Sequence, residues 1–428
     1  MITERRRGSR TLLLLGTLLP LAAQQPATRI EVLEQQRAER NRAIAAESQA
    51  RPESEKKGGL FSKIDTRAVI DALSGGGTGL SMRFGGLVTG SGFGLGPEYY
   101  RPDLANGNIA FRAFAVGSIR KYYLLHTSLS FPRIYSNRFA ASVEAERLDA
   151  PRMHYFGPGW DSRESARSSY RLERTTFDSR AAWRPTRESL QVGITGGLAL
   201  FNTGPGQDPR VPSVEMTFTD PAAPASPFFR PLPANLTPGL DRQTSFFRGG
   251  PFVELDLRDR PEDPHKGTHF LAQYRLWHDR NAAGYSFRRL ETSAEHYIPF
   301  FNRKRVIAFR AGTELSFTGT GQQVPFYLQS TLGGSDNLRG FHRFRFHGNH
   351  SVITTAEYRW EVIPALDMAI YGDAGKVFDQ IREFDLRHSA TSFGLGFRVK
   401  NRGKVVVRLD TGYSREGFQV WLKFRNVF

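Results

Sequence analysis

Hydrophobic and polar residues alternate along short segments from Gly79 to the end of the chain. In the last segment, from Phe418 to Phe428, apolar side chains occupy most alternate positions and polar ones fill many of the gaps between them. Successive side chains of a β-strand point to opposite faces, so this alternation is typical of strands with one apolar face. The segments are about ten residues long and end in turn residues, which suits strands that cross a membrane at a tilt of about 45°.

The predicted strands number sixteen, and an even number is what a bacterial outer-membrane barrel has. Their connections alternate between short turns, such as 132–137 and 300–304, and long loops, such as 203–242 and 318–350. A soluble sandwich also alternates apolar and polar residues, but it has no reason to alternate loop lengths in this way. We therefore predict an all-β fold for residues 70–428, a 16-stranded antiparallel transmembrane β-barrel. The predicted strands begin near Gly79, Ser91, Gly107, Lys121, Arg138, Ser169, Leu190, Ser245, Gly267, Tyr285, Arg305, Ser351, Asp367, Thr391, Gly403 and Phe418.

The first residues have the pattern of a secretory signal peptide. A basic start with four arginines precedes an apolar run of eleven residues, Thr11 to Leu21, and the small pair Ala22-Ala23. A short membrane anchor is the alternative, although eleven residues cover only about half of a ~30 Å hydrocarbon core. We predict a signal peptide over 1–23 and a periplasmic linker or short helix over 24–69. A helix that docks a partner is the alternative for that second stretch.

The composition excludes several classes of protein. The 428 residues include no cysteine, so disulfides, thiolate metal sites and thiol nucleophiles are impossible. No apolar run is long enough for a membrane-spanning helix. The net charge of +17 alone would suggest a nucleic-acid binder. Export from the cytoplasm argues against nucleic acid as a partner, and basic residues at a membrane surface favour anionic lipopolysaccharide or phospholipid headgroups instead.

Four local motifs go beyond a generic barrel. Gly333 to Phe341 reads GGSDNLRGF, Ala356 to Arg359 reads AEYR, Tyr371 to Phe378 reads YGDAGKVF, and the chain ends in Phe428. With these motifs, residues 79–428 resemble the barrel of the BamA/TamA-like superfamily, the bacterial surface antigen barrels. The resemblance implies a place in the bacterial outer membrane and a sixth outer loop tucked into the barrel.

The resemblance also implies which residues act together. Arg339 lies on a long loop, and Glu357 and Asp373 lie on the polar faces of the next two strands. If the loop folds inward, the guanidinium forms charge-assisted pairs with these two carboxylates. The alternative is that Arg339 is an ordinary solvated loop residue. The alternating, aromatic-ended last strand resembles the signal by which the barrel assembly machinery recognises its clients. The predicted site residues are Leu338, Arg339, Gly340 and Phe341 in the loop, Glu357, Asp373 and Gly375 in the wall, and Leu422, Phe424 and Phe428 in the C-terminal signal.

The resemblance implies a role in outer-membrane biogenesis or transport. We recognise no POTRA module before the barrel, which argues against substrate handling by such modules. A passive pore or structural barrel, and a translocator for a separately encoded partner, are the alternatives; the client itself is unknown. No hydrolase elbow, phosphate loop or zinc-protease motif occurs, so we predict no catalytic residue, cofactor or metal and no enzyme activity. His342, His347 and His350 lie close in sequence, but we interpret them as ordinary loop residues.

Overall fold

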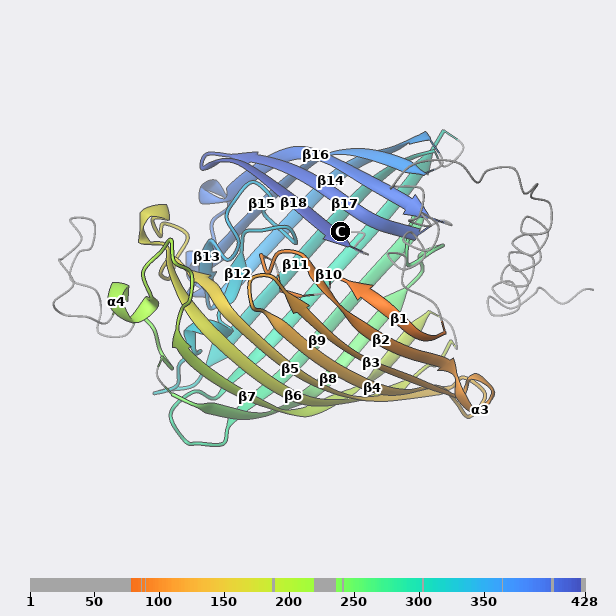
Figure 1. The fold of residues 1–428 in the computed structure, drawn as a ribbon, viewed down its shortest axis with the longest axis horizontal. Helices are drawn as coiled ribbons and strands as arrows, with labels where there is room; N and C mark the ends of the chain where they lie inside the picture. The colour runs from red at the N-terminus through yellow and green to blue at the C-terminus, as the bar shows by residue number, and fades with distance from the viewer. Residues whose placement is uncertain are drawn as a thin grey trace, which may run out of the picture. The chain divides into compact units, whose positions relative to one another are not determined.

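Sixteen strands form one antiparallel sheet in which each strand pairs with the next one along the barrel wall (Figure 1). This is a computed structural model, and it describes residues 78–85, 87–88, 90–186, 189–218, 236–240, 242–301, 304–363, 365–401 and 404–424. The predicted signal peptide and linker, and Phe428 of the predicted C-terminal signal, lie outside the described residues. The all-β barrel with sixteen strands is confirmed.

The wall strands follow the chain, interrupted by two short strands that pair only with each other, β12 and β13. Two short helices, α3 (Leu104–Gly107) and α4 (Val214–Phe218), lie in connections. The strands are β1 (Gly79–Phe84), β2 (Gly94–Asp103), β3 (Ile109–Ser118), β4 (Tyr123–Ile134), β5 (Phe139–Tyr155), β6 (Ser168–Trp183), β7 (Leu190–Pro205), β8 (Thr244–Asp256), β9 (Gly267–Asp279), β10 (Phe287–Phe300), β11 (Arg305–Thr318), β12 (Ser330–Leu332), β13 (Phe346–Gly348), β14 (His350–Ile363), β15 (Leu366–Phe378), β16 (Ala390–Asn401), β17 (Lys404–Ser414) and β18 (Gly417–Phe424).

Every wall strand begins within three residues of its predicted start. The largest difference is at the second strand, predicted from Ser91 and observed from Gly94. Gly90 and Gly92 adopt φ angles of 87° and 80°, a left-handed conformation that a strand does not contain. The connection between β1 and β2 is therefore longer than the sequence pattern indicates.

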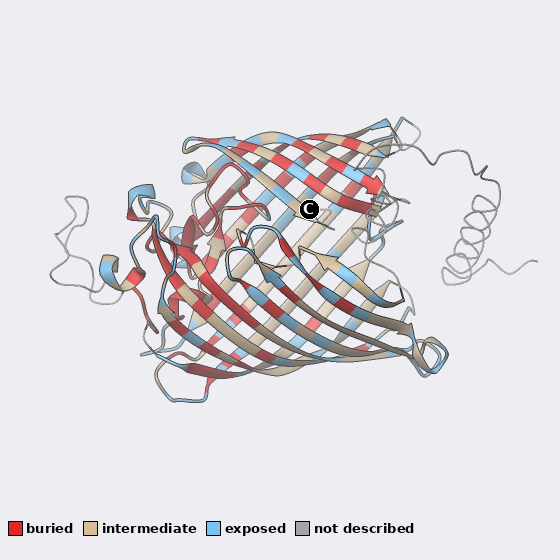
Figure 2. Cartoon of the chain, viewed as in Figure 1, coloured by how far each residue is buried: buried red, intermediate tan, exposed pale blue. Residues whose placement is uncertain are grey.

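On several strands, β16 to β18 among them, the alternation of residue types becomes an alternation of exposure (Figure 2). On β18, Phe418, Val420 and Leu422 are 61%, 56% and 59% exposed, whereas Trp421 and Lys423 on the opposite face are half-buried. Large apolar side chains on the outside of a barrel are the surface that faces lipid. The polar residues of the same strands consequently face the interior.

The two ends of the barrel differ. The long connections gather at one end, where α4, β12 and β13 also lie, and α3 marks the end with short turns (Figure 1). Short turns face the periplasm in bacterial barrels and long loops face outward. At the long-loop end a buried cluster rich in aromatic residues packs together, including Tyr155, Tyr170, Phe246, Trp277 and Phe326. Among the described residues, no helix is both long enough and apolar enough to cross a membrane.

Candidate functional site

The inner faces of β14 to β17 carry a dense group of buried charges. Glu357 and Arg359 lie on β14, Asp373 on β15, Arg398 on β16, and Arg408 with Asp410 on β17, and none of them is more than 5% exposed. Each alternates with an outward residue, as Arg398 does with the exposed Leu395 and Val399. The strand pattern alone therefore points these charges inward.

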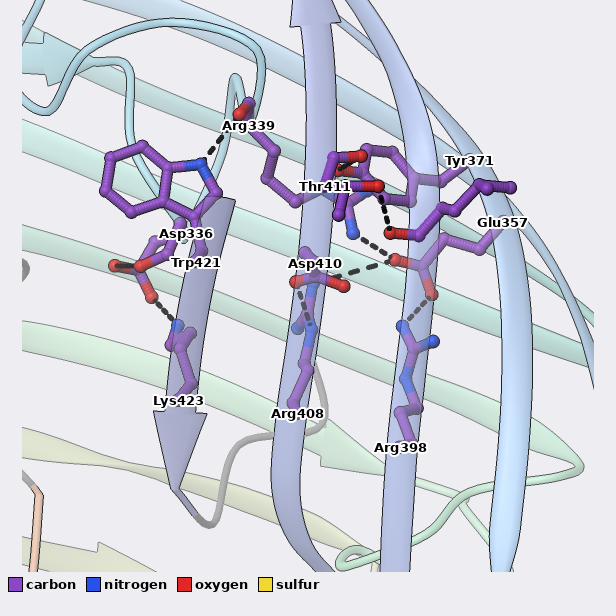
Figure 3. Close-up of polar contacts among 12 residues, drawn as sticks. Asp336, Arg339, Glu357, Tyr371, Arg398, Arg408, Asp410, Thr411, Trp421 and Lys423 are labelled. Atoms are coloured by element: carbon purple, nitrogen blue, oxygen red, sulfur yellow. Dashed lines mark hydrogen bonds and ion pairs between the residues drawn. The ribbon is translucent and has the colours of Figure 1, made fainter. Parts of the chain in front are cut away.

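The structure brings Arg339 to this wall from the loop between β12 and β13, residues 333–345 (Figure 3). Its Nε and Nη2 donate to the two oxygens of Asp373 at 3.0 and 2.7 Å, and Nη1 donates to Glu357 Oε1 at 2.6 Å. Its backbone N–H also donates to Asp373 Oδ2, at 3.2 Å. Burial opposes the charge on Arg339, but the carboxylates of Glu357 and Asp373 outweigh it and raise the pKa of the guanidinium.

Glu357 is shared by several arginines. Its Oε2 accepts from Arg359 Nε at 2.8 Å and from Arg398 Nη2 at 2.7 Å. Arg408 Nη2 lies 3.9 Å from Glu357 Oε1 and pairs more closely with Asp410. With Arg339 and Asp373, the group holds four arginines and three carboxylates. Such a network resists disruption, because removing one member leaves a buried charge unpaired.

The backbone of the 333–345 loop lies directly against β17 and β18. Trp421 Nε1 donates to the carbonyl of Arg339 at 2.7 Å, and Ser414 Oγ donates to the carbonyl of Gly340 at 2.6 Å. A Cβ at Gly412 would lie 2.4 Å from the Arg339 oxygen, so glycine is required there for this close approach. The Arg339 guanidinium also stacks on the Tyr371 ring, 3.2 Å from its centroid.

Apolar side chains of the same loop pack beside the charges. Leu338 and Phe341 are fully buried and form a cluster with Leu332, Ile353 and Val377. Gly375 lies beneath this cluster, and a Cβ there would come within 3.0 Å of Leu332 Cδ1. All seven loop and wall residues singled out from the sequence therefore meet in one place. Arg339 and Gly340 of the loop make polar contacts with the wall, and Glu357 and Asp373 of the wall accept those of Arg339.

The sequence did not single out several residues of this group. Trp421, Ser414 and Gly412 hold the loop backbone, and Arg398, Arg408 and Asp410 complete the charges. The sequence feature that could have identified Arg398, Arg408 and Asp410 is the series of charged residues at inward positions of β16 and β17. The three histidines that lie close in sequence have different partners: His342 contacts Glu164, His347 contacts Tyr155 and His350 contacts Phe378. In the described part of the chain, no three acidic or histidine residues are placed to hold a metal ion.

The first and last strands meet at a seam that has no ladder. Among the described residues, no backbone pairing joins β1 to β18, although each pairs with its other neighbour. The contact is made by Phe424 of the predicted C-terminal signal, whose ring packs on Phe93 with centroids 5.9 Å apart. Phe424 Cβ also lies 3.2 Å from where a Cβ at Gly85 would be. Leu422 of the same signal points outward, 59% exposed.

The turn between β8 and β9, residues 257–266, reaches the opposite side of the short-turn end. Asp263 pairs with Lys400 of β16 at 3.7 Å, and Glu262 pairs with Lys404 of β17 at 3.2 Å. Four strands separate β9 from β16 in the sheet, so the turn must extend across the barrel opening to make these contacts. Lys400 also binds Asp367 at 2.7 Å, which fixes the position of the ammonium group.

We expect Asp263→Asn to release this turn. Asp263 is buried and loses its ion pair, whereas the neighbouring Glu262 has a side chain that is 57% exposed. Exposed pairs contribute only about 0–1 kcal/mol, so Glu262→Gln serves as the matched control. Trypsin should cleave detergent-solubilised Asp263→Asn after Lys266, which Gly267 follows, severalfold faster than the wild type and the control. Equal cleavage of all three proteins would show that the ion pair does not hold the turn.

Comparison with known proteins gives one family and several structures. The Omp85 superfamily domain matches residues 77–401. BamA from Haemophilus ducreyi lacking POTRA domains 1–3 is similar in structure, with a TM-score of 0.57 and 15% identity over 80% of this chain and 70% of that one. CdiB from Acinetobacter baumannii has a TM-score of 0.46 and 13% identity, covering 81% of this chain and 56% of that one. CdiB from Escherichia coli has a TM-score of 0.47 and 14% identity, covering 79% and 58%. No curated protein matches the sequence.

Proposed function

The chain belongs to the Omp85 superfamily, and we propose that it acts in outer-membrane biogenesis or protein transport by opening the barrel between β1 and β18. Membership makes it a barrel protein of the bacterial outer membrane rather than an enzyme. The relation to BamA and CdiB supports the general role and leaves the client to be identified. A neighbouring protein or nascent barrel is the class of partner that this role requires.

The observation that carries the proposal is the seam without a ladder. Neighbouring β17 and β18 pair over eight positions, whereas β1 and β18 share no pairing among the described residues. An unpaired strand edge presents free N–H and C=O groups, which are costly in lipid and form a template for a further strand. A client strand could satisfy these groups by pairing with either edge.

The filled interior supports a lateral route over a passive pore. The 333–345 loop packs on β14 to β18, and the 257–266 turn extends across the short-turn end. A molecule that crossed through the barrel would have to displace both segments, including the buried pairs of Arg339. Among the described residues of β1 and β18 and their flanks, opening of the seam separates Phe424 from Gly85 and Phe93, and it leaves the buried pairs of Arg339 with β14 and β15 in place.

The proposal is tested by locking the seam with a disulfide. The chain has no cysteine, so Gly85→Cys with Phe424→Cys introduces a single possible bond. The Cβ separation of 3.2 Å is just below the usual range of about 3.5–4.5 Å, so closure requires a small shift. Gly85 has a φ of 67°, so a cysteine there strains the backbone, and the reduced variant measures that effect separately from the disulfide. In liposomes, the reduced variant should accelerate insertion of a test barrel, and the oxidised variant should not.

A second cysteine pair provides the matched control. Thr411 and Val420 face each other in the β17–β18 ladder, so a disulfide there joins strands that are already paired. The oxidised Thr411→Cys, Val420→Cys protein should stimulate insertion as well as the wild type does. Full activity of the seam-locked protein would exclude lateral opening, and failure of the wild type to stimulate insertion would exclude the assembly role.

A further inference from the structure

Four arginines converge at the long-loop end of the barrel, away from the charges around Arg339. We call Arg120, Arg152, Arg167 and Arg343 the outer arginine cluster. They come from the β3–β4 turn, from β5, from the β5–β6 connection and from the 333–345 loop. Arg343 Nη2 donates to the carbonyl of Arg152 at 3.1 Å, and both Arg343 and Arg167 face His154 Nε2, at 3.1 and 3.5 Å.

Arg343 is the buried member of the outer arginine cluster. It is only 6% exposed, and its Nη1 has no hydrogen-bond partner within the described ranges. A Cβ at Gly90 would lie 1.6 Å from this nitrogen, so the guanidinium rests directly on the glycine backbone of the β1–β2 connection. The Nε atoms of Arg152 and Arg167 are likewise buried and without an acceptor in the part of the chain that the structure describes.

The carboxylates near this cluster do not balance its charge. Asp208 is the buried carboxylate beside His154, and it is already bound by Arg210 and by His154 Nε2, each at 3.2 Å. Burial lowers the pKa of Arg343, and Arg120 and Arg167 lower it further, against the opposing effects of Tyr122 and Asp208. Arg339 provides the contrast, because two carboxylates neutralise it directly. The outer arginine cluster is therefore a concentration of positive charge with buried donors that no described residue accepts from.

We propose that the outer arginine cluster binds a phosphate group. Guanidinium forks match the geometry of phosphate oxygens, and a buried donor without an acceptor gains most from such an anion. Arg120, Arg152 and Arg167 are half-buried, so the cluster is accessible from outside while Arg343 lines its base. The phosphate belongs either to a lipid headgroup of the outer leaflet or to a free phosphate ion. The site does not depend on opening of the seam.

The site is tested by the thermal stability of the full-length, detergent-solubilised protein during titration with inorganic phosphate. Wild-type protein should be stabilised in a saturable manner, and Arg343→Gln should lower the apparent affinity about tenfold or more, as loss of a charge-assisted hydrogen bond predicts. Arg167→Gln, at a half-buried position, should weaken binding as well and covers the case in which Arg343→Gln does not fold. Arg345→Gln is the matched control, because Arg345 lies in the same loop but is paired with Glu416 and Ser162.

A second titration separates the two sources of phosphate. Maltoside micelles doped with lipid A are compared with micelles doped with the same glycolipid after removal of its phosphates. Stabilisation by both lipid A and inorganic phosphate supports a general phosphate site, and stabilisation by lipid A alone supports a headgroup site. The proposal is overturned if neither probe shifts the melting temperature, or if Arg343→Gln and Arg167→Gln respond as Arg345→Gln does.

Discussion

Arg339→Glu is expected to destabilise the barrel strongly. The substitution removes the cation from Glu357 and Asp373 and places a third carboxylate between them. All three groups are shielded from water, and breaking a buried pair costs about 3–5 kcal/mol even before like charges are added. On gels run without boiling, the fraction that migrates as folded barrel should fall sharply, and unfolding in urea should begin at lower concentration.

Reversing the charge at Asp373 tests whether the ion pair with Arg339 is the cause of the lost stability. Asp373→Arg alone should be similarly harmful, because it would place two guanidinium groups where one is now paired. The double variant Arg339→Glu, Asp373→Arg should recover part of the loss, since opposite charges again face each other. Arg382→Glu is the control for charge reversal, because Arg382 is exposed in an outer loop. If neither single variant at the site changes gel migration or urea unfolding, the buried pairing contributes nothing to stability.

The wall of the barrel was predictable because two different solvents act on alternate residues. Lipid requires apolar side chains such as Phe393 and Leu395, and the interior accepts polar ones such as Arg398. Apolar and polar residues therefore alternate in the sequence with the two-residue period of a strand. The starts of β7, β9 and β11 were predicted at the residue where they occur. The start of β2 was less accurate because Gly90 and Gly92 adopt left-handed turn geometry, which delays the strand until Gly94.

Contacts between distant segments were predictable only where a motif identified them. The loop and wall motifs contain Arg339, Glu357 and Asp373, so these residues could be predicted. No sequence pattern around Trp421 indicates that it would bind the Arg339 carbonyl, 82 residues away in the chain. The same holds for the turn that joins Asp263 to Lys400. Such contacts depend on which strands the barrel places opposite each other, and alternation along one strand does not contain that information. The seam is a further example, since β1 and β18 each have an ordinary strand pattern.

Replacing the 333–345 loop with a tight turn is expected to turn the barrel into an open channel. Leu332 pairs directly with Phe346, so the dipeptide Asn-Gly can join them as a two-residue hairpin without changing the β12–β13 register. Water would then reach Glu357, Asp373 and the surrounding arginines, which limits the cost of their unpaired charges. In planar bilayers the shortened protein should pass a large, steady current, whereas the wild type should be silent or open only briefly.

A control replacement in another outer connection tests whether the increase in conductance is specific to loss of the 333–345 loop. Residues 381–388 belong to another outer connection, and replacing them with a glycine–serine segment of equal length leaves Arg339 and its partners in place. That control should conduct no more than the wild type, and both variants should retain the folded gel migration. A silent barrel without the 333–345 loop would mean that other segments close the interior, with the 257–266 turn and the aromatic cluster at the long-loop end as the remaining barriers. A large current through the wild type would instead favour the passive pore over the lateral route, because the interior would then be open with the loop in place.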